Sequence, residues 1–155
     1  MVCHTLLSGQ LFNHDFEVGP GSTILLGTLE NFKKVKSRFD GVAVFTEVYL
    51  ASWIKYKGTR YRPGMTLWIS HSVDGEPEFG TIQKMVLLNS KVQLIVKRWD
   101  TTGFERHLFA FTVSPTSEID AVDINSIADY HPLHIVRSHK ENDNDHYISL
   151  RYRLF

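Results

Sequence analysis

Short apolar runs separated by tight polar turns dominate the middle of this chain, between Tyr56 and Val113. Residues 61–69, 79–88 and 92–96 are such runs, and the turn dipeptides Asp74-Gly75 and Asn89-Ser90 separate them. Apolar runs of this length between Gly, Pro, Asn and Asp are typical of β-strands joined by tight turns. Because the connections are too short for parallel crossovers, the pattern predicts an antiparallel sheet, curled into a barrel or folded as a sandwich.

Two further hairpins are expected outside the central run. Lys57-Gly58 is a two-residue turn signal, which predicts that residues 53–56 pair with residues 59–61. Near the end of the chain, residues 133–138 and 147–154 are predicted to pair across a polar loop. Both hairpins extend the same antiparallel arrangement.

Helical patterns are few. Apolar residues recur at spacings of three and four from Leu29 to Phe39, which predicts a short amphipathic helix with basic residues on its wet side. A second, single helical turn is expected after Asp123, with that aspartate as its cap. The expected fold is therefore mainly β: a curled antiparallel sheet with one or two short helices.

The length of 155 residues predicts one domain, residues 1–155. We expect its core to occupy about residues 42–155, with residues 1–40 as an extension that carries the short helix. Hydrophobic residues make up 43% of the chain, which is enough to fill such a core.

No apolar run approaches the roughly 20 residues that a membrane-spanning helix needs, and the first residues lack the pattern of a secretory signal. The single cysteine, Cys3, cannot form an internal disulfide. A chain with one cysteine fits a reducing compartment. These features predict an intracellular protein, nuclear or cytosolic, that has no membrane partner.

The net charge is zero, but the charges are unevenly distributed. Residues 33–62 hold eight cations against two acids, and residues 115–146 hold seven acids against two cations. The cations are Lys33, Lys34, Lys36, Arg38, Lys55, Lys57, Arg60 and Arg62. Such asymmetry predicts one basic and one acidic surface, with ordinary solvated faces as the alternative interpretation.

Patterns for metal binding and catalysis are weak. His131 and His134 have H-x-x-H spacing, but His131 precedes Pro132, and an extended chain directs the two rings to opposite faces. No nucleophile elbow or phosphate-binding loop is present. We therefore expect no metal, no cofactor and no catalytic residue; an enzyme with an unrecognised site is the third interpretation of the chain.

Aromatic residues are interleaved with cations in the middle of the chain, and both could contact a ligand. Such a mixture can stack unpaired bases, or hold a methylated ammonium in an aromatic cage. The alternative is that large aromatics fill a β core. The candidate aromatic contacts are Trp53, Tyr56, Tyr61, Trp68 and Trp99, and the candidate basic contacts are Lys33, Lys34, Lys36, Arg38, Arg60 and Arg62. If Leu67 and Ile69 face the core, strand parity directs Trp68 to the other face, as an anchor for a protein partner.

The order of these motifs resembles a known family. Tyr61-Arg-Pro-Gly-Met-Thr-Leu-Trp-Ile, then Pro77-Glu-Phe-Gly-Thr-Ile-Gln-Lys-Met, then Lys97-Arg98-Trp99 is similar to the early core of bromo-adjacent homology domains. The same motifs are similar to β modules of uncharacterised proteins associated with mobile elements. The resemblance covers about residues 56–136, and Met65 stands where that family usually has an acidic residue. It implies a non-catalytic module that binds chromatin or protein, and it transfers no ligand-binding position.

The sequence thus favours a non-enzymatic interaction module that docks a protein partner, such as a chromatin component. The alternative is direct, largely sequence-independent nucleic-acid binding through the basic residues 33–62.

Overall fold

The computed structural model describes residues 16–30, 32–36, 43, 45–137 and 146–149. These residues form β-strands, one α-helix and two single 3-10 turns. In chain order they are β1 (Phe16–Val18), β2 (Gly21–Leu25), η1 (Leu26–Thr28), α2 (Phe32–Lys36), β3 (Glu47–Ala51), β4 (Ile54–Tyr56), β5 (Thr59–Tyr61), β6 (Thr66–His71), β7 (Pro77–Leu88), β8 (Lys91–Glu105), β9 (Ala110–Asp123), η2 (Ile124–Ser126), β10 (Ile135–Arg137) and β11 (His146–Ser149). The predicted fold class, mainly β with a curled antiparallel sheet, is confirmed.

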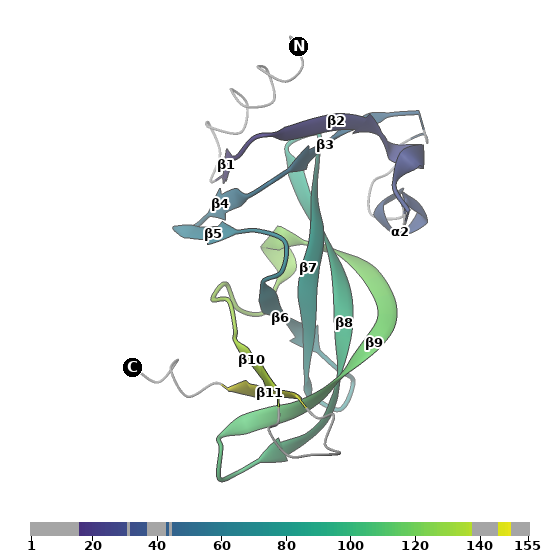
Figure 1. Ribbon diagram of the computed structural model, residues 1–155. Helices are drawn as coiled ribbons and strands as arrows, with labels where there is room; N and C mark the ends of the chain where they lie inside the picture. The colour runs from purple at the N-terminus through teal and green to yellow at the C-terminus, as the bar shows by residue number, and fades with distance from the viewer. Residues whose placement is uncertain (1–15, 31, 37–42, 44, 138–145, 150–155) are drawn as a thin grey trace.

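The strands form two antiparallel sheets. The larger sheet has eight strands, with β6 paired to β7 beside the order β10-β11-β9-β8-β7-β3-β2. It curls strongly into a half-barrel built on the long strands β7, β8 and β9 (Figure 1). The smaller sheet has three strands in the order β1-β4-β5. One bridge draws distant parts of the larger sheet together, because the Leu133 amide donates a hydrogen bond to the Thr66 carbonyl at 2.8 Å.

Irregular pairing explains the curl. The register between β7 and β8 shifts between Ile82 and Lys84, and the register between β8 and β9 shifts twice, between Lys97 and Trp99 and again after Thr101. Such bulges bend a strand and increase its right-handed twist. Strands of twelve to fifteen residues can therefore curl around a small core instead of forming a flat sheet.

The predicted tight turns are present. Lys57 and Gly58 both have positive φ, at 50° and 83°, and join β4 to β5. Asn89 and Ser90, at 51° and 65°, join β7 to β8. Two consecutive residues with positive φ match the twist of antiparallel strands, which is why Asn and Gly at these positions favour hairpins. The expected final hairpin is also present as β10–β11, while the predicted loop 140–145 lies outside the described residues.

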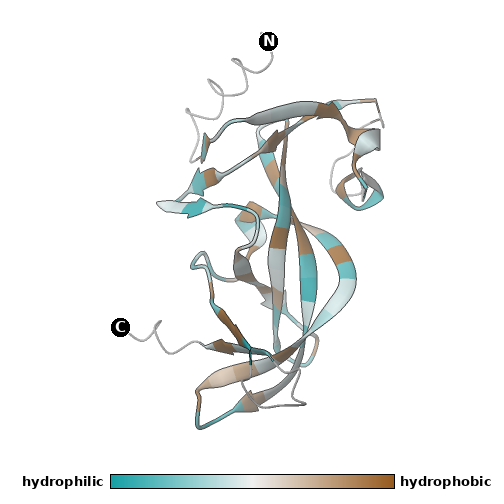
Figure 2. Ribbon diagram, viewed as in Figure 1, coloured by the Kyte–Doolittle hydropathy of each residue, from teal (hydrophilic) through white to brown (hydrophobic). Residues whose placement is uncertain are grey.

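Buried side chains form three clusters. The main cluster lies between the two sheets and includes Phe16, Tyr61, Leu67 and Leu94. A second cluster lies where η1 and α2 cover part of the larger sheet, and a third surrounds Phe79. Residues 85–88 of β7 and 92–96 of β8 are buried without interruption, because the main cluster covers one face of these strands and the second cluster covers the other. Hydrophobic and polar stretches therefore follow one another along the long strands (Figure 2).

The described residues between Phe16 and Val35 contribute to the sheets and to the core. β1 pairs with β4 and β2 pairs with β3, so both strands are integral to the sheets. Leu26, Leu29 and Val35 are buried in the second cluster. These pairings connect residues far apart in sequence, which no local pattern reveals.

Helical structure is present at both positions where it was predicted, but the second position differs in detail. α2 lies within the predicted segment 29–39, of which residues 37–39 are outside the described chain. A single turn, η2, does follow Asp123, which is at the N-cap position as predicted, but the Asp123 side chain makes no capping hydrogen bond. The Asp123 carboxylate instead accepts a hydrogen bond from the side-chain amide of buried Gln93. The Asp123 carboxylate is therefore bound to Gln93 on the neighbouring strand β8 and does not cap the turn.

Candidate interaction surface

The three-stranded sheet has one buried face and one exposed face. On the buried face, Phe16 lies opposite Tyr56, and the two rings stack with centroids 4.7 Å apart. On the other face, Glu17, Lys55 and Arg60 lie side by side in register across β1, β4 and β5, and all three are exposed. Side chains alternate between the faces along each strand. The exposed row is therefore fixed by the same pairing that builds the core.

Trp53 and Arg60 form a stack on the exposed face. The guanidinium carbon of Arg60 lies 4.2 Å from the centre of the Trp53 ring, within cation–π distance. Gly19 lies against the same indole, since a Cβ atom at that position would be 2.3–2.5 Å from three atoms of the five-membered ring. The Gly19 amide also donates a hydrogen bond to the Trp53 carbonyl at 2.9 Å. The indole is held against the backbone, and Arg60 is held on the indole.

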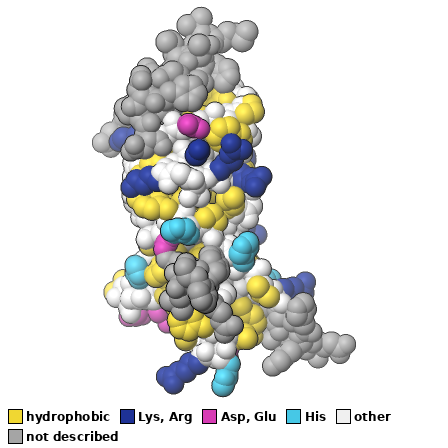
Figure 3. All heavy atoms as spheres, turned by 90° about the vertical axis from the view of Figure 1, so that its left-hand side faces the viewer, with side chains coloured by type: hydrophobic (Ala, Val, Ile, Leu, Met, Phe, Trp, Pro, Cys, Tyr) yellow, Lys and Arg dark blue, Asp and Glu magenta, His cyan; other side chains and the backbone are white. Residues whose placement is uncertain are grey.

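The exposed face is basic. Lys55, Arg60 and Arg62 are exposed there, Lys57 is in the adjoining turn, and Glu17 is the acid in the same row. Figure 3 views the molecule from the side where β4 and β5 lie in Figure 1, and shows Lys and Arg side chains gathered among apolar ones in its upper half. We call this surface, comprising Trp53, Lys55, Lys57, Arg60 and Arg62, the hairpin face.

The structure assigns Tyr56 and Tyr61 to the core. Tyr56 is 5% exposed and Tyr61 is 0% exposed. The Tyr56 hydroxyl donates to the side-chain oxygen of Asn125 at 2.8 Å, and the Tyr61 hydroxyl donates to the carbonyl of Tyr130. Both rings fill the space between the sheets, because strand parity places them opposite Lys55 and Arg60. They support the hairpin face from beneath and do not form part of it.

Lys57 ties the hairpin to the segment after η2. Its ammonium donates a hydrogen bond to the Tyr130 hydroxyl at 2.9 Å and lies 4.4 Å from the centre of the Tyr130 ring. The hydrogen bond from this cation lowers the pKa of Tyr130 from its ordinary value. Burial has the opposite effect on Tyr61 and raises its pKa to about 12. As the pH rises, the Tyr130 hydroxyl therefore loses its proton before the Tyr61 hydroxyl does.

We expect stability to fall with pH above about 10 because of Tyr61. The unfolded chain releases this proton near 10.0, and the folded protein retains it to about 12. The stabilising difference is complete below the unfolded pKa and is lost as pH rises through the folded one. By pH ~11 the free energy of unfolding should fall by about 1.4 kcal/mol through this group. Urea unfolding of the protein and of Tyr61→Phe, measured between about pH 9 and pH 11, gives the dependence of the unfolding free energy on pH for each. If the unfolding free energy falls equally with pH in both proteins, the prediction is contradicted.

The other predicted basic residues lie elsewhere. Lys33 and Lys34 are exposed on α2, which also contains Lys36, while Arg38 lies outside the described residues. α2 and the β4–β5 hairpin lie on opposite sides of the same end of the molecule (Figure 1). The single basic surface expected from residues 33–62 is thus divided into two, because the chain crosses the sheet between them as β3.

Trp68 is only partly exposed. Leu67 and Ile69 are buried in the main cluster, and Trp68 lies on the opposite side, packed against the cluster around Phe79. Its ring contacts His71 and Phe79, at centroid distances of 5.1 and 6.3 Å, and its indole nitrogen donates to the Ser70 carbonyl at 3.1 Å. The sheet curls, so the face opposite the main core is itself partly covered.

Trp99 lies beside a surface groove. Its indole nitrogen donates to the Thr81 hydroxyl at 2.8 Å, and its ring lies 5.1 Å from that of His146. The groove has a volume of about 270 Å³ and is also lined by Lys97 and Pro115. Trp99 is on β8 of the larger sheet, whereas Trp53 directly precedes β4 of the smaller sheet and contacts Arg60 of β5, so the candidate aromatic residues do not converge on one site.

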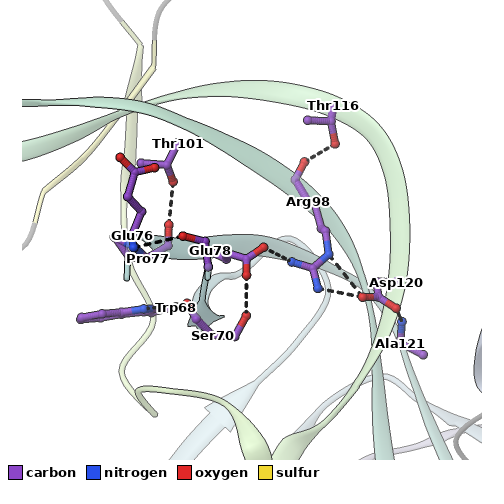
Figure 4. A network of polar contacts seen from close by, with 11 residues as sticks. Trp68, Ser70, Glu76, Pro77, Glu78, Arg98, Thr101, Thr116, Asp120 and Ala121 are labelled. Carbon is purple, nitrogen blue, oxygen red and sulfur yellow. Dashed lines mark hydrogen bonds and ion pairs between the residues drawn. The ribbon is translucent and has the colours of Figure 1, made fainter. Parts of the chain in front are cut away.

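A polar network joins three strands of the half-barrel (Figure 4). Arg98 on β8 forms ion pairs with Glu78 on β7 at 2.9 Å and with Asp120 on β9 at 2.7 Å. Glu78 also accepts a hydrogen bond from the Ser70 hydroxyl at 3.3 Å. Both carboxylates are thus bound to one guanidinium, which gives this network a structural role between strands.

Two kinds of feature are absent from the described ranges. No three His, Cys, Asp or Glu side chains there are grouped so that they could hold a metal ion. None of the helices there is long and apolar enough to span a bilayer.

Gly19 and Tyr130 position the hairpin face, and neither is among the candidate residues predicted from the sequence. Gly19-Pro20-Gly21 by itself indicates only a break between regular elements. The available signal was that two glycines flank a proline ahead of a strand, which is typical of a close backbone approach. No local signal marks Tyr130, because its contacts are with residues about seventy positions away.

Known proteins offer no guide to the role of the hairpin face. No family model, curated protein or solved structure significantly matches the chain. The resemblance to bromo-adjacent homology domains therefore stays a prediction based on the short motifs quoted above.

Proposed function

We propose that this protein is a non-enzymatic interaction module that docks a protein partner through the hairpin face. The observation that supports the proposal is the Trp53–Arg60 stack, set on an exposed sheet face among further cations. Tryptophan and arginine are enriched among the residues that contribute most to protein interfaces. The opposite face of this sheet is core, so the contact residues project from a rigid base.

The resemblance to bromo-adjacent homology domains implies a chromatin component as this partner. A partner of that class would require the protein to be in the nucleus, and the single cysteine agrees with either the nucleus or the cytosol. The similarity to β modules of mobile-element proteins implies the same kind of non-catalytic role.

Direct nucleic-acid binding is the second candidate, and the cations of the hairpin face favour it. Aromatic and basic side chains together can bind a single strand by stacking and by phosphate contacts. Binding of this kind weakens steeply with salt, because each phosphate contact releases counterions. The division of the basic residues between α2 and the hairpin leaves a short track for a backbone, which favours the protein partner.

Reversing two charges on the hairpin face tests the proposal. We expect Lys55→Glu/Arg62→Glu to reduce partner capture at least about tenfold, because two favourable charges become repulsive. The free energy of unfolding should change by less than about 0.5 kcal/mol, since both side chains are exposed. Capture from nuclease-treated and untreated extract, followed by identification of the bound proteins, measures the first quantity, and urea unfolding measures the second.

Arg106→Glu provides the matched control. Arg106 is exposed in the turn between β8 and β9, at the far end of the molecule (Figure 1). Its reversal should leave capture unchanged. If nuclease abolishes capture by the unmodified protein, the partner is nucleic acid and the second candidate replaces the first. If both variants lose capture equally, the hairpin face is not the docking surface.

A further inference from the structure

We propose that the hairpin face binds carboxylate side chains of an acidic segment in the partner, and that the Arg60 guanidinium binds the first of them. This inference rests on the proposed function and adds the chemistry of the ligand. It assigns a distinct role to each of three residues: Arg60 contacts the ligand, Trp53 positions Arg60, and Gly19 positions Trp53.

The contact with Trp53 restricts the Arg60 side chain before an anion binds. An arginine side chain ordinarily loses much rotational freedom when it binds, which opposes association. Here the guanidinium already lies on the indole, 4.2 Å from the ring centre. A planar guanidinium presents its N–H donors in a fork that matches the two oxygens of a carboxylate. The guanidinium donates no hydrogen bond to another of the described residues, so its N–H groups remain for a ligand.

Among the described residues, the row of charges on the exposed face lacks an acid beside Arg60. Glu17, Lys55 and Arg60 follow one another across β1, β4 and β5, with the signs minus, plus and plus. Side chains directly opposite on neighbouring strands lie about 4.5–5.5 Å apart at Cβ, so adjacent like charges repel. Glu17 can offset Lys55, whereas no carboxylate of the described residues pairs with Arg60. A carboxylate of the partner would occupy the fourth position.

The dimensions of the face favour a peptide over a nucleic acid. Three strands spaced at about 4.8 Å, each three residues long at about 3.3 Å per residue, give a surface roughly 10 Å by 10 Å. An extended chain crosses a surface of this width with about three residues. A protein that binds duplex DNA through roughly 6–10 phosphate contacts needs a longer track than this face, and α2 lies on the opposite side of this end of the molecule from β4 and β5 (Figure 1).

Binding of a fluorescein-labelled hexaglutamate peptide to the full chain, measured by anisotropy at low salt, tests the assignment. Arg60→Gln should raise the dissociation constant about tenfold or more, the effect of losing a charge-assisted bidentate contact. Arg60→Lys keeps the charge but loses the fork, and should weaken binding nearly as much. Arg106→Gln, the same substitution at the far end of the molecule, should leave binding unchanged.

Gly19→Ala tests the positioning without altering any charge. The added methyl would overlap the indole, so Trp53 must move and Arg60 loses its support. We expect a several-fold weaker binding of hexaglutamate and a shift in tryptophan emission, with the far-ultraviolet circular dichroism unchanged. Unaltered binding by a variant whose emission has shifted would show that the stack does not prepare Arg60.

Two further probes identify the source of the anion. A hexapeptide with phosphoserine in place of glutamate tests for a phosphorylated segment, and a single-stranded oligothymidine tests for nucleic acid. Hexaglutamate binding that requires Arg60 supports the inference, whereas binding of only the phosphopeptide or only the oligothymidine overturns it. Equal weakening by Arg60→Gln, Arg60→Lys and Arg106→Gln also overturns it, because it would indicate diffuse attraction.

Partner capture separates this inference from the proposed function. If Arg60→Gln retains nuclease-resistant capture while Lys55→Glu/Arg62→Glu loses it, the docking surface stands and the role of Arg60 is wrong. If the unmodified protein captures no protein but binds hexaglutamate through Arg60, the anion site stands and the docking proposal is wrong.

Discussion

Replacing Tyr61 with alanine should lower the free energy of unfolding by about 3–5 kcal/mol, the range for emptying a buried aromatic site. The ring is 0% exposed and lies in the cluster between the two sheets. Its hydroxyl also donates to the Tyr130 carbonyl, which tethers β5 to the segment after η2. The loss combines the removed apolar contacts, the cavity that remains and a carbonyl left without its donor. Urea unfolding followed by fluorescence measures it.

Two comparisons make this result specific. Tyr61→Phe keeps the ring and removes the hydrogen bond, so it should cost about 1 kcal/mol. Trp53→Ala removes a larger but only partly buried side chain, and should cost clearly less than Tyr61→Ala. If Tyr61→Ala costs no more than Trp53→Ala, Tyr61 is not a core residue.

Arg98→Met should lower the free energy of unfolding by about 2 kcal/mol. Removing one partner of a buried ion pair costs roughly 3–5 kcal/mol. We expect less here, because the side chains of Arg98, Glu78 and Asp120 are 18%, 37% and 21% exposed and solvent screens them. The variant leaves two carboxylates near each other with no cation between them. Urea unfolding of Arg98→Met and of the parent protein measures the difference.

A triple variant checks that charge, not packing, causes this loss. Arg98→Met/Glu78→Gln/Asp120→Asn removes all three charges while it keeps similar volumes. It should recover most of the lost stability, since replacing a whole ion-pair network is often nearly neutral. A triple variant as unstable as Arg98→Met would indicate that the aliphatic part of Arg98 matters more than its charge.

Local patterns predicted the parts of this fold that depend on few residues. The turns at Lys57-Gly58 and Asn89-Ser90 follow from backbone preferences of the residues themselves, and the structure has positive φ at all four positions. The short apolar runs between such turns likewise predicted the mainly β class. These features are set within a few residues of each position, so sequence alone is sufficient for them.

Features that depend on distant partners could not be predicted in this way. Strand parity correctly separates Trp53 from Tyr56 and Trp68 from Leu67, but it does not say which face water reaches. That depends on what covers each face: β1 and the segment near Tyr130 beside Tyr56, and the curl of the sheet beside Trp68. The bulges after Ile82 and Lys97 produce the curl, and no residue pattern marks them.

The contacts beneath the hairpin face also couple binding to folding. Lys57 and Tyr61 contact Tyr130, and Tyr56 contacts Asn125, across separations of 69 to 73 residues. Loops of that length close late, because their entropy must be overcome before their contacts form. The surface is complete only once both halves of the chain have assembled. A ligand that recognises it therefore binds the native state and not a half-formed one, and at saturating concentration it raises the melting temperature by mass action.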